Sequence, residues 1–208
     1  MTLIIKYLGL TEYQESWDAM KNHIEKQPNT DELWVTEHPS IYTTGLNKKD
    51  HVLPKNDIPH LFVDRGGKIT YHGPGQLIIY TLINLKKNNL TIRQLISILE
   101  ESVISFLSNH KIDASSKKDA PGVYVNKKKI ASIGLRIKKD YTYHGLSFNI
   151  NMNLKPFLEI NPCGFNDLKM AQLADLNIKS DLKDTAKLIL PIIQKKFKQH
   201  NEEHTKQN

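Results

Sequence analysis

A glycine-rich stretch between two apolar segments constrains the fold of this chain more than any other feature. Residues 64–76 are DRGGKITYHGPGQ and contain four of the ten glycines in the 208-residue sequence. The flanking segments HLFVD (60–64) and QLIIYTLINL (76–85) are typical of strands, the second of a strand buried on both faces. Glycine lets a backbone approach a ligand closely and expose its N–H groups. We therefore expect a ligand-binding loop, with side-chain donors on Arg65, Lys68, Thr70, Tyr71, His72 and Gln76.

This stretch matches neither of the common phosphate-binding patterns. Gly67 and Lys68 are followed by Ile69, where a Walker A loop needs serine or threonine. Gly73 and Gly75 lack the third glycine of a dinucleotide fingerprint. The sequence therefore predicts a binding loop of another kind.

The order of predicted elements indicates an α+β fold with a mixed sheet. Helical spacing extends over residues 10–26, 90–110 and 184–197, and Pro191 is expected to kink or interrupt the last helix. Thr11 with Gln14, and Thr91 with Gln94, match the capping-box pattern. Strands are expected near the N-terminus and over residues 32–37, 40–45, 60–64, 76–85, 122–126, 129–137 and 143–151. We expect a single domain over residues 1–208, with a polar tail from about residue 200.

Composition and charge restrict the class of protein. A hydrophobic content of 39% and a charged content of 25% fit a soluble globular chain, and no apolar stretch is long enough to span a bilayer. The start of the chain lacks the pattern of a signal peptide, and one cysteine cannot form an internal disulfide, so we expect a cytoplasmic protein. The net charge of +7 indicates an acidic partner, which could be nucleic acid or an acidic protein.

The tail contains one pattern that suggests a metal site. HNEEH, residues 200–204, matches the H-x-x-E-H arrangement of some zinc proteases. The surrounding tail is entirely polar and offers no apolar face to hold the ligands in place. We therefore expect no metal.

The only cysteine lies in a turn-forming setting. Pro162 and Gly164 flank Cys163, a pair that favours a turn over a helix or strand. A free cysteine is often a buried apolar filler, but one on a turn is also a candidate nucleophile. A nucleophilic thiol needs a nearby positive charge to stabilise its thiolate. Strand alternation over 129–137 predicts that Lys129 shares an apolar face with Ala131, Ile133 and Leu135.

Several segments together resemble the lipoyl(octanoyl) transferases, the octanoyl-[acyl-carrier-protein]:protein N-octanoyltransferases. The matching segments are EHPSIYTTG, RGGKITYHGPGQLIIY, APGVYVNKKKIASIGLRI, YHGLSFNIN and INPCGF, which span roughly residues 30–175 in order. The resemblance implies the catalytic-domain fold of biotin and lipoate protein ligases, a mixed sheet plus a smaller sheet with flanking helices. It also implies transfer of an octanoyl group from acyl carrier protein to a lysine of a lipoyl-dependent domain, the first step of lipoate biosynthesis.

The resemblance also implies the site residues and the partners. Cys163 would form a thioester acyl-enzyme and Lys129 would pair with it. Substrate contacts would come from Arg65, Gly66, Gly67, Lys68, Ile69, Thr70, Tyr71, His72, Ser132, Ile133, Gly134, Gly145, Leu146 and Ser147. Small residues at Gly134 and Gly145 would leave room for an acyl chain. The partners would be acyl carrier protein, the lipoyl domains of 2-oxoacid dehydrogenase complexes and the glycine cleavage H protein, without nucleic acid, membrane, ATP or a cofactor.

Three alternatives remain open on the sequence. His72 or His144, rather than Lys129, could accept the proton. A lipoate or biotin protein ligase would need ATP and would not need Cys163. A basic, non-catalytic nucleic-acid or carrier-binding protein would explain the charge but not the glycine-rich stretch or the Cys163–Lys129 pair.

Overall fold

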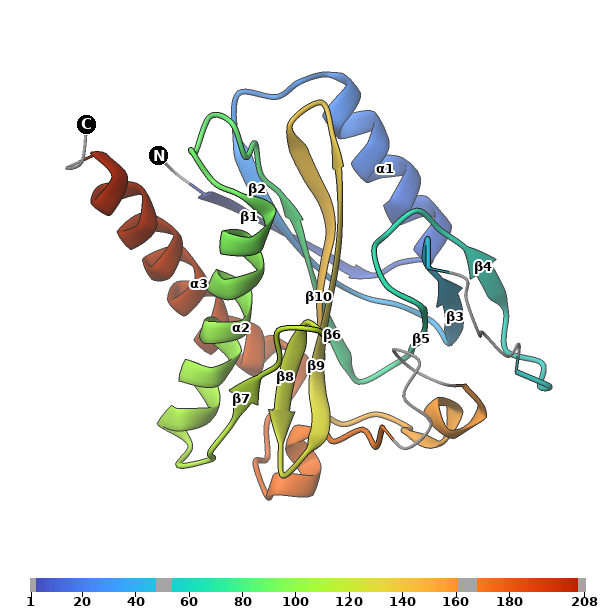
Figure 1. Ribbon diagram of the computed structural model, residues 1–208. Coiled ribbons are helices and arrows are strands. Elements are labelled where there is room, and N and C mark those ends of the chain that lie inside the picture. Colours follow the sequence, from blue (N-terminus) through green and yellow to red (C-terminus); the bar gives the residue numbers. More distant parts are fainter. Residues whose placement is uncertain (1–2, 48–53, 161–167, 206–208) are drawn as a thin grey trace.

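The computed structural model describes residues 3–47, 54–160 and 168–205, and its main element is a seven-stranded sheet (Figure 1). In spatial order the strands are β1 (Leu3–Leu10), β2 (Asp31–Glu37), β6 (Gln76–Leu82), β10 (Tyr141–Asn149), β9 (Lys128–Lys138), β8 (Gly122–Val125) and β7 (Ser115–Ser116). β1 and β2 are parallel, and every other neighbouring pair is antiparallel. The predicted mixed sheet is confirmed.

A second, three-stranded sheet consists of β4 (His60–Phe62), β3 (Ile41–Thr44) and β5 (Ile69–His72). β5 lies inside the glycine-rich stretch, which the sequence analysis treated as one loop. Its four residues pair in antiparallel register with β3, because isoleucine, threonine and tyrosine fit a pleated strand once a partner is available. A separate apolar cluster of Tyr42, Ile69, Tyr71, Met152, Phe157 and Ile160 supports this small sheet.

The helices cover both faces of the large sheet (Figure 1). α2 (Ile92–Asn109) and α3 (Leu182–Thr205) pack on one face, in the larger core cluster, and α1 (Tyr13–Glu25) packs on the other. In the described part of the chain, short 3₁₀ segments occupy Lys155–Glu159 and Leu173–Leu176. None of the helices in the described ranges combines the length and apolarity needed to cross a membrane.

One of the two predicted capping boxes is present. The Thr91 side chain accepts a hydrogen bond from the Gln94 amide, and the Gln94 side chain accepts one from the Thr91 amide. The prediction at Thr11 is wrong, because α1 begins after Glu12, which makes no side-chain cap. The Thr11 hydroxyl instead lies 2.8 Å from the Ser16 hydroxyl.

Pro191 does not interrupt the last helix. α3 is continuous from Leu182 to Thr205, so the helix also extends past residue 200, where a polar tail was predicted. Leu190 and Ile193, on either side of the proline, are both buried in the larger core cluster. Burial of this face stabilises the helix enough to offset the hydrogen bond that proline cannot make.

We expect Thr91→Ala to lower the free energy of unfolding by about 1 kcal/mol, because it removes the side-chain acceptor of the α2 cap. Urea denaturation monitored by circular dichroism measures this change. Ser108→Ala, at an exposed position in the same helix, is the control and should change stability by less than about 0.5 kcal/mol. Equal effects of the two substitutions would contradict the cap assignment.

Candidate active site

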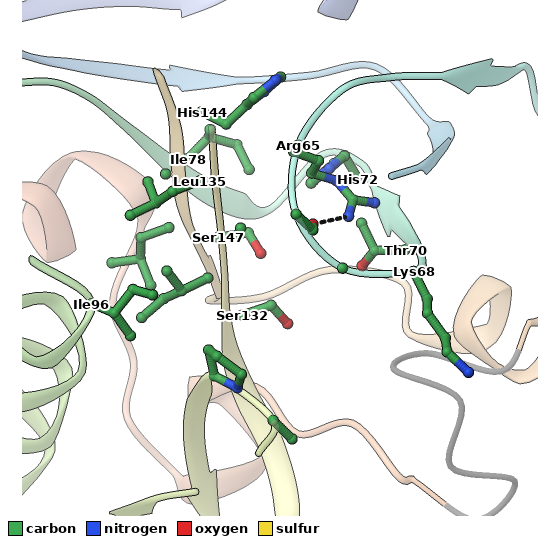
Figure 2. Close-up of a pocket in the computed structure, with 18 of the residues that line it drawn as sticks. Arg65, Lys68, Thr70, His72, Ile78, Ile96, Ser132, Leu135, His144 and Ser147 are labelled. Carbon is green, nitrogen blue, oxygen red and sulfur yellow. Dashed lines mark hydrogen bonds between the residues drawn. The ribbon is translucent and has the colours of Figure 1, made fainter. Parts of the chain in front are cut away.

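A cavity of about 370 Å³ lies where the glycine-rich stretch meets the large sheet (Figure 2). This volume is within the range of small-molecule sites, about 300–1,000 Å³. Ser132 and Ser147 extend toward the side of β9 and β10 that faces Arg65 and Thr70 (Figure 2). The remaining walls come from the ends of α1 and α2, from β6 and from residues 119–121.

The glycine-rich stretch is held by hydrogen bonds to both sheets. The Arg65 guanidinium donates to the Thr43 carbonyl at 2.7 Å and to the Thr43 hydroxyl at 2.9 Å, which joins it to β3. The Gly66 amide donates to the Leu135 carbonyl at 3.0 Å, which joins the stretch to β9. The stretch therefore connects the small sheet to the large one.

Two glycines that line the cavity are needed for close packing. A Cβ at Gly134 would lie 3.1 Å from the Gly66 oxygen and 3.3 Å from the Arg65 Cδ. A Cβ at Gly145 would lie 2.0 Å from the Ile79 carbonyl oxygen. We expected these glycines to leave room for an acyl chain. That expectation is wrong, because protein atoms occupy the space beside both glycines.

Lys129 lies on a different face of its strand from the one predicted. A β-bulge interrupts the pairing of β8 with β9, so Val123 faces Ala131 while Tyr124 faces Lys129. Ile130 and Ala131, although adjacent, both belong to the larger core cluster. The extra residue reverses the alternation and places Lys129 on the cavity side with Ser132.

The Lys129 side chain is buried, at 2% exposure, among groups that suit a cation. Its Nζ lies 5.4 Å from the centre of the Tyr124 ring. Gly122, at a φ of 139°, is required beside it, because a Cβ there would lie 2.4 Å from the Lys129 Cε. The Gly122 amide donates to the Glu100 carboxylate at 2.8 Å. Burial raises the pKa of Glu100, and the positive charge of Lys129 acts in the opposite direction.

The predicted nucleophile, Cys163, lies outside the described residues. The chain that follows contacts Lys129 directly: the Lys129 amide donates to the Lys169 carbonyl and the Ala171 amide donates to the Lys129 carbonyl, both at 2.9 Å. Residues 169–171 therefore extend the sheet beside Lys129 as an isolated parallel bridge at Met170.

His72 is buried in a hydrogen-bond network that leaves its ring neutral. The Gln76 amide nitrogen donates to Asn149 at 2.9 Å, so the Gln76 oxygen faces His72 Nδ1 at 2.8 Å and accepts its proton. His72 Nε2 lies 3.4 Å from the Thr43 hydroxyl. Burial lowers the pKa of His72 to about 3, and the neighbouring His38 and Arg65 act in the same direction. A ring with both nitrogens engaged and so low a pKa is a poor proton acceptor at neutral pH.

His144 and His38 are engaged in the same way. His144 Nε2 lies 3.0 Å from the Asp64 carboxylate, its Nδ1 lies 3.3 Å from the Tyr13 hydroxyl, and burial lowers its pKa. His38 Nδ1 donates to the Thr11 carbonyl at 2.7 Å and its Nε2 accepts from the Tyr80 hydroxyl at 2.6 Å. Burial lowers the pKa of His38 to about 4.

Nearly all of the site residues predicted from the sequence line this one cavity. Those present are Arg65, Gly66, Gly67, Lys68, Ile69, Thr70, His72, Lys129, Ser132, Ile133, Gly134, Gly145, Leu146 and Ser147. Among the described residues, Tyr71 and the candidate donor Gln76 do not line it. The position of Tyr71 has a simple cause. Alternation along β5 turns its ring into the cluster beneath the small sheet, where its hydroxyl lies 2.9 Å from that of Ser40.

Sequence reasoning missed several lining residues. Tyr13 and Tyr80 contribute aromatic hydroxyls, and Ile92 and Ile96 contribute apolar surface from α2. Tyr80 lies within a matching motif, so its position on the cavity side of β6 could have been noticed. The α1 and α2 residues carried no signal, because only packing brings their helix ends to the cavity. Among the described residues, no group of three histidine, cysteine, aspartate or glutamate side chains is arranged to hold a metal ion.

Comparisons with known sequences agree with this arrangement. Residues 12–194 match the family model of the lipoyl protein ligase A/B catalytic domain. The octanoyltransferase of Colwellia psychrerythraea is 44% identical over 206 residues, covering 98% of this chain and 88% of the relative. The octanoyltransferase of Shewanella frigidimarina is 49% identical over 174 residues, covering 82% of this chain and 81% of the relative.

Solved structures share the fold at low sequence identity. A putative lipoate protein ligase from Thermoplasma acidophilum with bound lipoic acid has a TM-score of 0.76 at 14% identity, covering 98% of this chain and 94% of that one. Biotin protein ligase from Aquifex aeolicus has a TM-score of 0.58 at 18% identity, covering 97% and 71%. The predicted ligase-like fold is confirmed.

The buried histidines predict a loss of stability in mild acid. Their pKa values in the folded protein lie below 6.5, so below pH 6.5 the unfolded chain takes up protons that the folded chain does not. Each fully neutral histidine should lower the free energy of unfolding by up to about 1.4 kcal/mol per pH unit as the pH falls toward 4. Urea titrations between pH 7 and pH 4 measure how steeply the free energy of unfolding falls as the pH is lowered. In His72→Gln this fall per pH unit should be smaller than in the parent by about this amount. An unchanged slope would mean that His72 is protonated in the folded state.

Proposed function

The chain belongs to the octanoyltransferases, acyltransferases built on the lipoyl protein ligase A/B catalytic domain, and we propose that it transfers an octanoyl group from acyl carrier protein to a lysine of a lipoyl domain. The transfer replaces a thioester by an amide, which is downhill, so no ATP is required. The reaction would be the first step of lipoate biosynthesis in the cytoplasm. The acceptors would include the lipoyl domains of 2-oxoacid dehydrogenase complexes and the glycine cleavage H protein.

In the first half-reaction the Cys163 thiolate attacks the carrier thioester. A new thioester forms on Cys163, the bond to the carrier sulfur breaks, and the carrier leaves as a thiol after taking up a proton. Exchange of one thiol for another is nearly isoenergetic, so the acyl group stays activated. The backbone hydrogen bonds that join Lys169 and Ala171 to Lys129 are the observation that carries this proposal, because they tie the chain just after the cysteine segment to the buried lysine.

In the second half-reaction an acceptor lysine amine attacks the acyl-enzyme. The amide bond forms, the Cys163–acyl bond breaks, and one amine proton must be removed. Lys129 is our candidate for this proton transfer and for stabilising the thiolate, since it is the buried cation of the cavity side of β9 and lies beside Ser132. The low pKa of His72, and the engagement of both ring nitrogens of His144, argue against the alternative bases.

The length of β9 that lines the cavity suits an octanoyl chain. The Lys129 ammonium lies near Gly122, and Gly122 pairs with Ser132 of β9. Leu135, three residues after Ser132 along β9, pairs with His144 of β10. Three residues of strand span about 10 Å. An extended octanoyl group has seven carbon–carbon bonds and, at about 1.2 Å per bond as in an extended backbone, is about 8 Å long. The acyl chain would therefore extend from the lysine toward His144.

The surface charge supports docking of acidic proteins. Lys127 and Lys128 are exposed at the turn that leads into Lys129. Their positive charges would form a basic rim that attracts an acidic carrier protein or lipoyl domain. Lys138 belongs to the other end of β9 and forms an ion pair with Glu25 at 2.5 Å. The basic rim beside the cavity therefore consists of Lys127 and Lys128 in the first turn, together with Lys68, which lines the cavity itself.

Incubation with octanoyl-carrier protein in the absence of ATP tests the reaction. We expect one octanoyl adduct in the intact-protein mass spectrum of the parent, and its transfer to an added lipoyl domain. Cys163→Ala and Cys163→Ser should lose both adduct and transfer. An adduct that appears only with ATP and free octanoate would instead identify a ligase, and transfer by Cys163→Ala would contradict the acyl-enzyme.

Lys129→Ala should move the alkylation of Cys163 by iodoacetamide to higher pH and slow both half-reactions, because it removes the charge and the base together. Lys129→Arg should retain part of the thiolate stabilisation but not proton transfer, since guanidinium does not lose a proton usefully. Lys128→Ala, the exposed neighbour, is the matched control for the alkylation profile. If the profile of Lys129→Ala equals that of the parent, Lys129 does not pair with the thiol.

A further inference from the structure

Asp64, the residue immediately before Arg65, accepts hydrogen bonds from three side chains. The Trp17 indole N–H and His144 Nε2 each lie 3.0 Å from its Oδ1, and the Tyr143 hydroxyl donates to its Oδ2. Burial by itself would raise the pKa of Asp64, but the bonds from His144, Tyr143 and Trp17 outweigh it and lower the pKa to about 2. Asp64 is therefore an ionised carboxylate that can only accept hydrogen bonds.

An ionised Asp64 determines which nitrogen of His144 carries the proton. Because the carboxylate only accepts, His144 Nε2 must be the protonated nitrogen. The ring is neutral, so Nδ1 carries a lone pair and the Tyr13 hydroxyl, 3.3 Å away, must donate to it. His144 has a φ of 61°, a backbone conformation that a non-glycine residue adopts only when its surroundings enforce it. Both observations indicate a ring held in one orientation.

The direction of the Tyr13 proton determines what the Tyr13 oxygen presents to the cavity. With its proton committed to His144, the Tyr13 oxygen is left as an acceptor on the cavity wall, which Arg65 also lines. Burial raises the pKa of Tyr13 to about 12, and the positive charge of Arg65 acts in the opposite direction. Arg65 has only donors, and it donates to the Thr43 oxygens and to the Gly66 carbonyl. The Tyr13 oxygen and the Arg65 guanidinium therefore border the same cavity as acceptor and donor.

We propose that Asp64 is a positioning residue for octanoyl transfer: through His144 it sets the direction of the Tyr13 hydroxyl and so keeps the Tyr13 oxygen as an acceptor on the cavity wall that Arg65 also lines. Asp64 does not itself line the cavity, so it acts through the residues that do. Its effect on activity rests on the proposed function, whereas its effect on the His144 ring does not.

Without the Asp64 carboxylate, nothing would fix the direction of the hydrogen bond between His144 and Tyr13. In Asp64→Ala, His144 Nε2–H has no acceptor, so the ring gains by moving the proton to Nδ1 and donating to Tyr13. The Tyr13 oxygen would then accept from His144, and its own proton would have to point elsewhere along the cavity wall. In Asp64→Asn the amide oxygen can still accept from Trp17 and His144, with the amide nitrogen facing the Tyr143 hydroxyl. Asp64→Asn should therefore preserve the direction of the hydrogen bonds from Asp64 through His144 to Tyr13.

The first measurement is the tautomer of His144, by ¹⁵N NMR of histidine-labelled protein. We expect the Nε2–H form in the parent and in Asp64→Asn, and a substantial Nδ1–H population in Asp64→Ala. Trp17→Phe removes a different hydrogen bond to Asp64 and is the control, with an unchanged tautomer. An Nδ1–H ring in the parent would overturn the proposal without any variant.

The second measurement is a double-mutant cycle on kcat/KM for octanoyl transfer. Asp64→Ala should lower kcat/KM about 10- to 100-fold, the range expected when a hydrogen bond to a charged group is lost, and Asp64→Asn should retain most of it. Tyr13→Phe should itself reduce the rate, and adding Asp64→Ala to it should cause little further loss, because both substitutions break one chain. Additive losses would show that Asp64 only anchors the structure.

The two measurements separate this inference from the proposed function. Iodoacetamide alkylation of Cys163 should be unchanged in Asp64→Ala, since the thiol and Lys129 are untouched. If the parent forms no octanoyl adduct, the proposed function fails. The tautomer of His144 still decides whether Asp64 sets the direction of the hydrogen bond between His144 and Tyr13.

Discussion

The close approach of the glycine-rich stretch to β9 is the constraint on which the rest of the site depends. The Gly66 amide bonds to the Leu135 carbonyl across Gly134, where a Cβ would lie 3.1 Å from the Gly66 oxygen. This contact joins the small sheet to the large one and gives the cavity its wall. It also explains why glycines cluster here without a phosphate-binding pattern: the backbone must approach another strand, and the ligand space is what remains beside it.

Burial has a second consequence at the same place, since it keeps the histidines around the cavity neutral. His38 and His72 have low pKa values because a charged ring would be poorly solvated there, and each ring is oriented by an acceptor on its Nδ1. Neutral, oriented rings make a rigid wall rather than a set of proton acceptors. In the mechanism that we propose, proton transfer is assigned to Lys129, whose surroundings are the Tyr124 ring and the Glu100 carboxylate.

The fold by itself does not distinguish the reactions it supports. The chain shares its architecture with lipoate and biotin protein ligases at identities of 14% and 18%, too low to carry an activity. Identity with octanoyltransferases is far higher, at 44% and 49%. The distinction that we propose rests on a few residues, chiefly Lys129 and the cysteine segment that follows β10, and not on the arrangement of strands and helices.

Local sequence by itself determined most of the strands, the positions of the helices and the α2 cap, because period, β-branched content and a Thr91–Gln94 pair act within a few residues, but it missed the short strands β5 and β7. It also determined the family, since the motifs are contiguous strings. Only the tertiary structure decided the cavity face of Lys129, which a single bulged residue reversed, and the continuity of α3 through Pro191, which core packing stabilises. The hydrogen bonds from Asp64 to His144 and from His144 to Tyr13 join residues that are 80 and 131 positions apart in the sequence. Such contacts follow from how sheets and helices pack, and no local pattern encodes them.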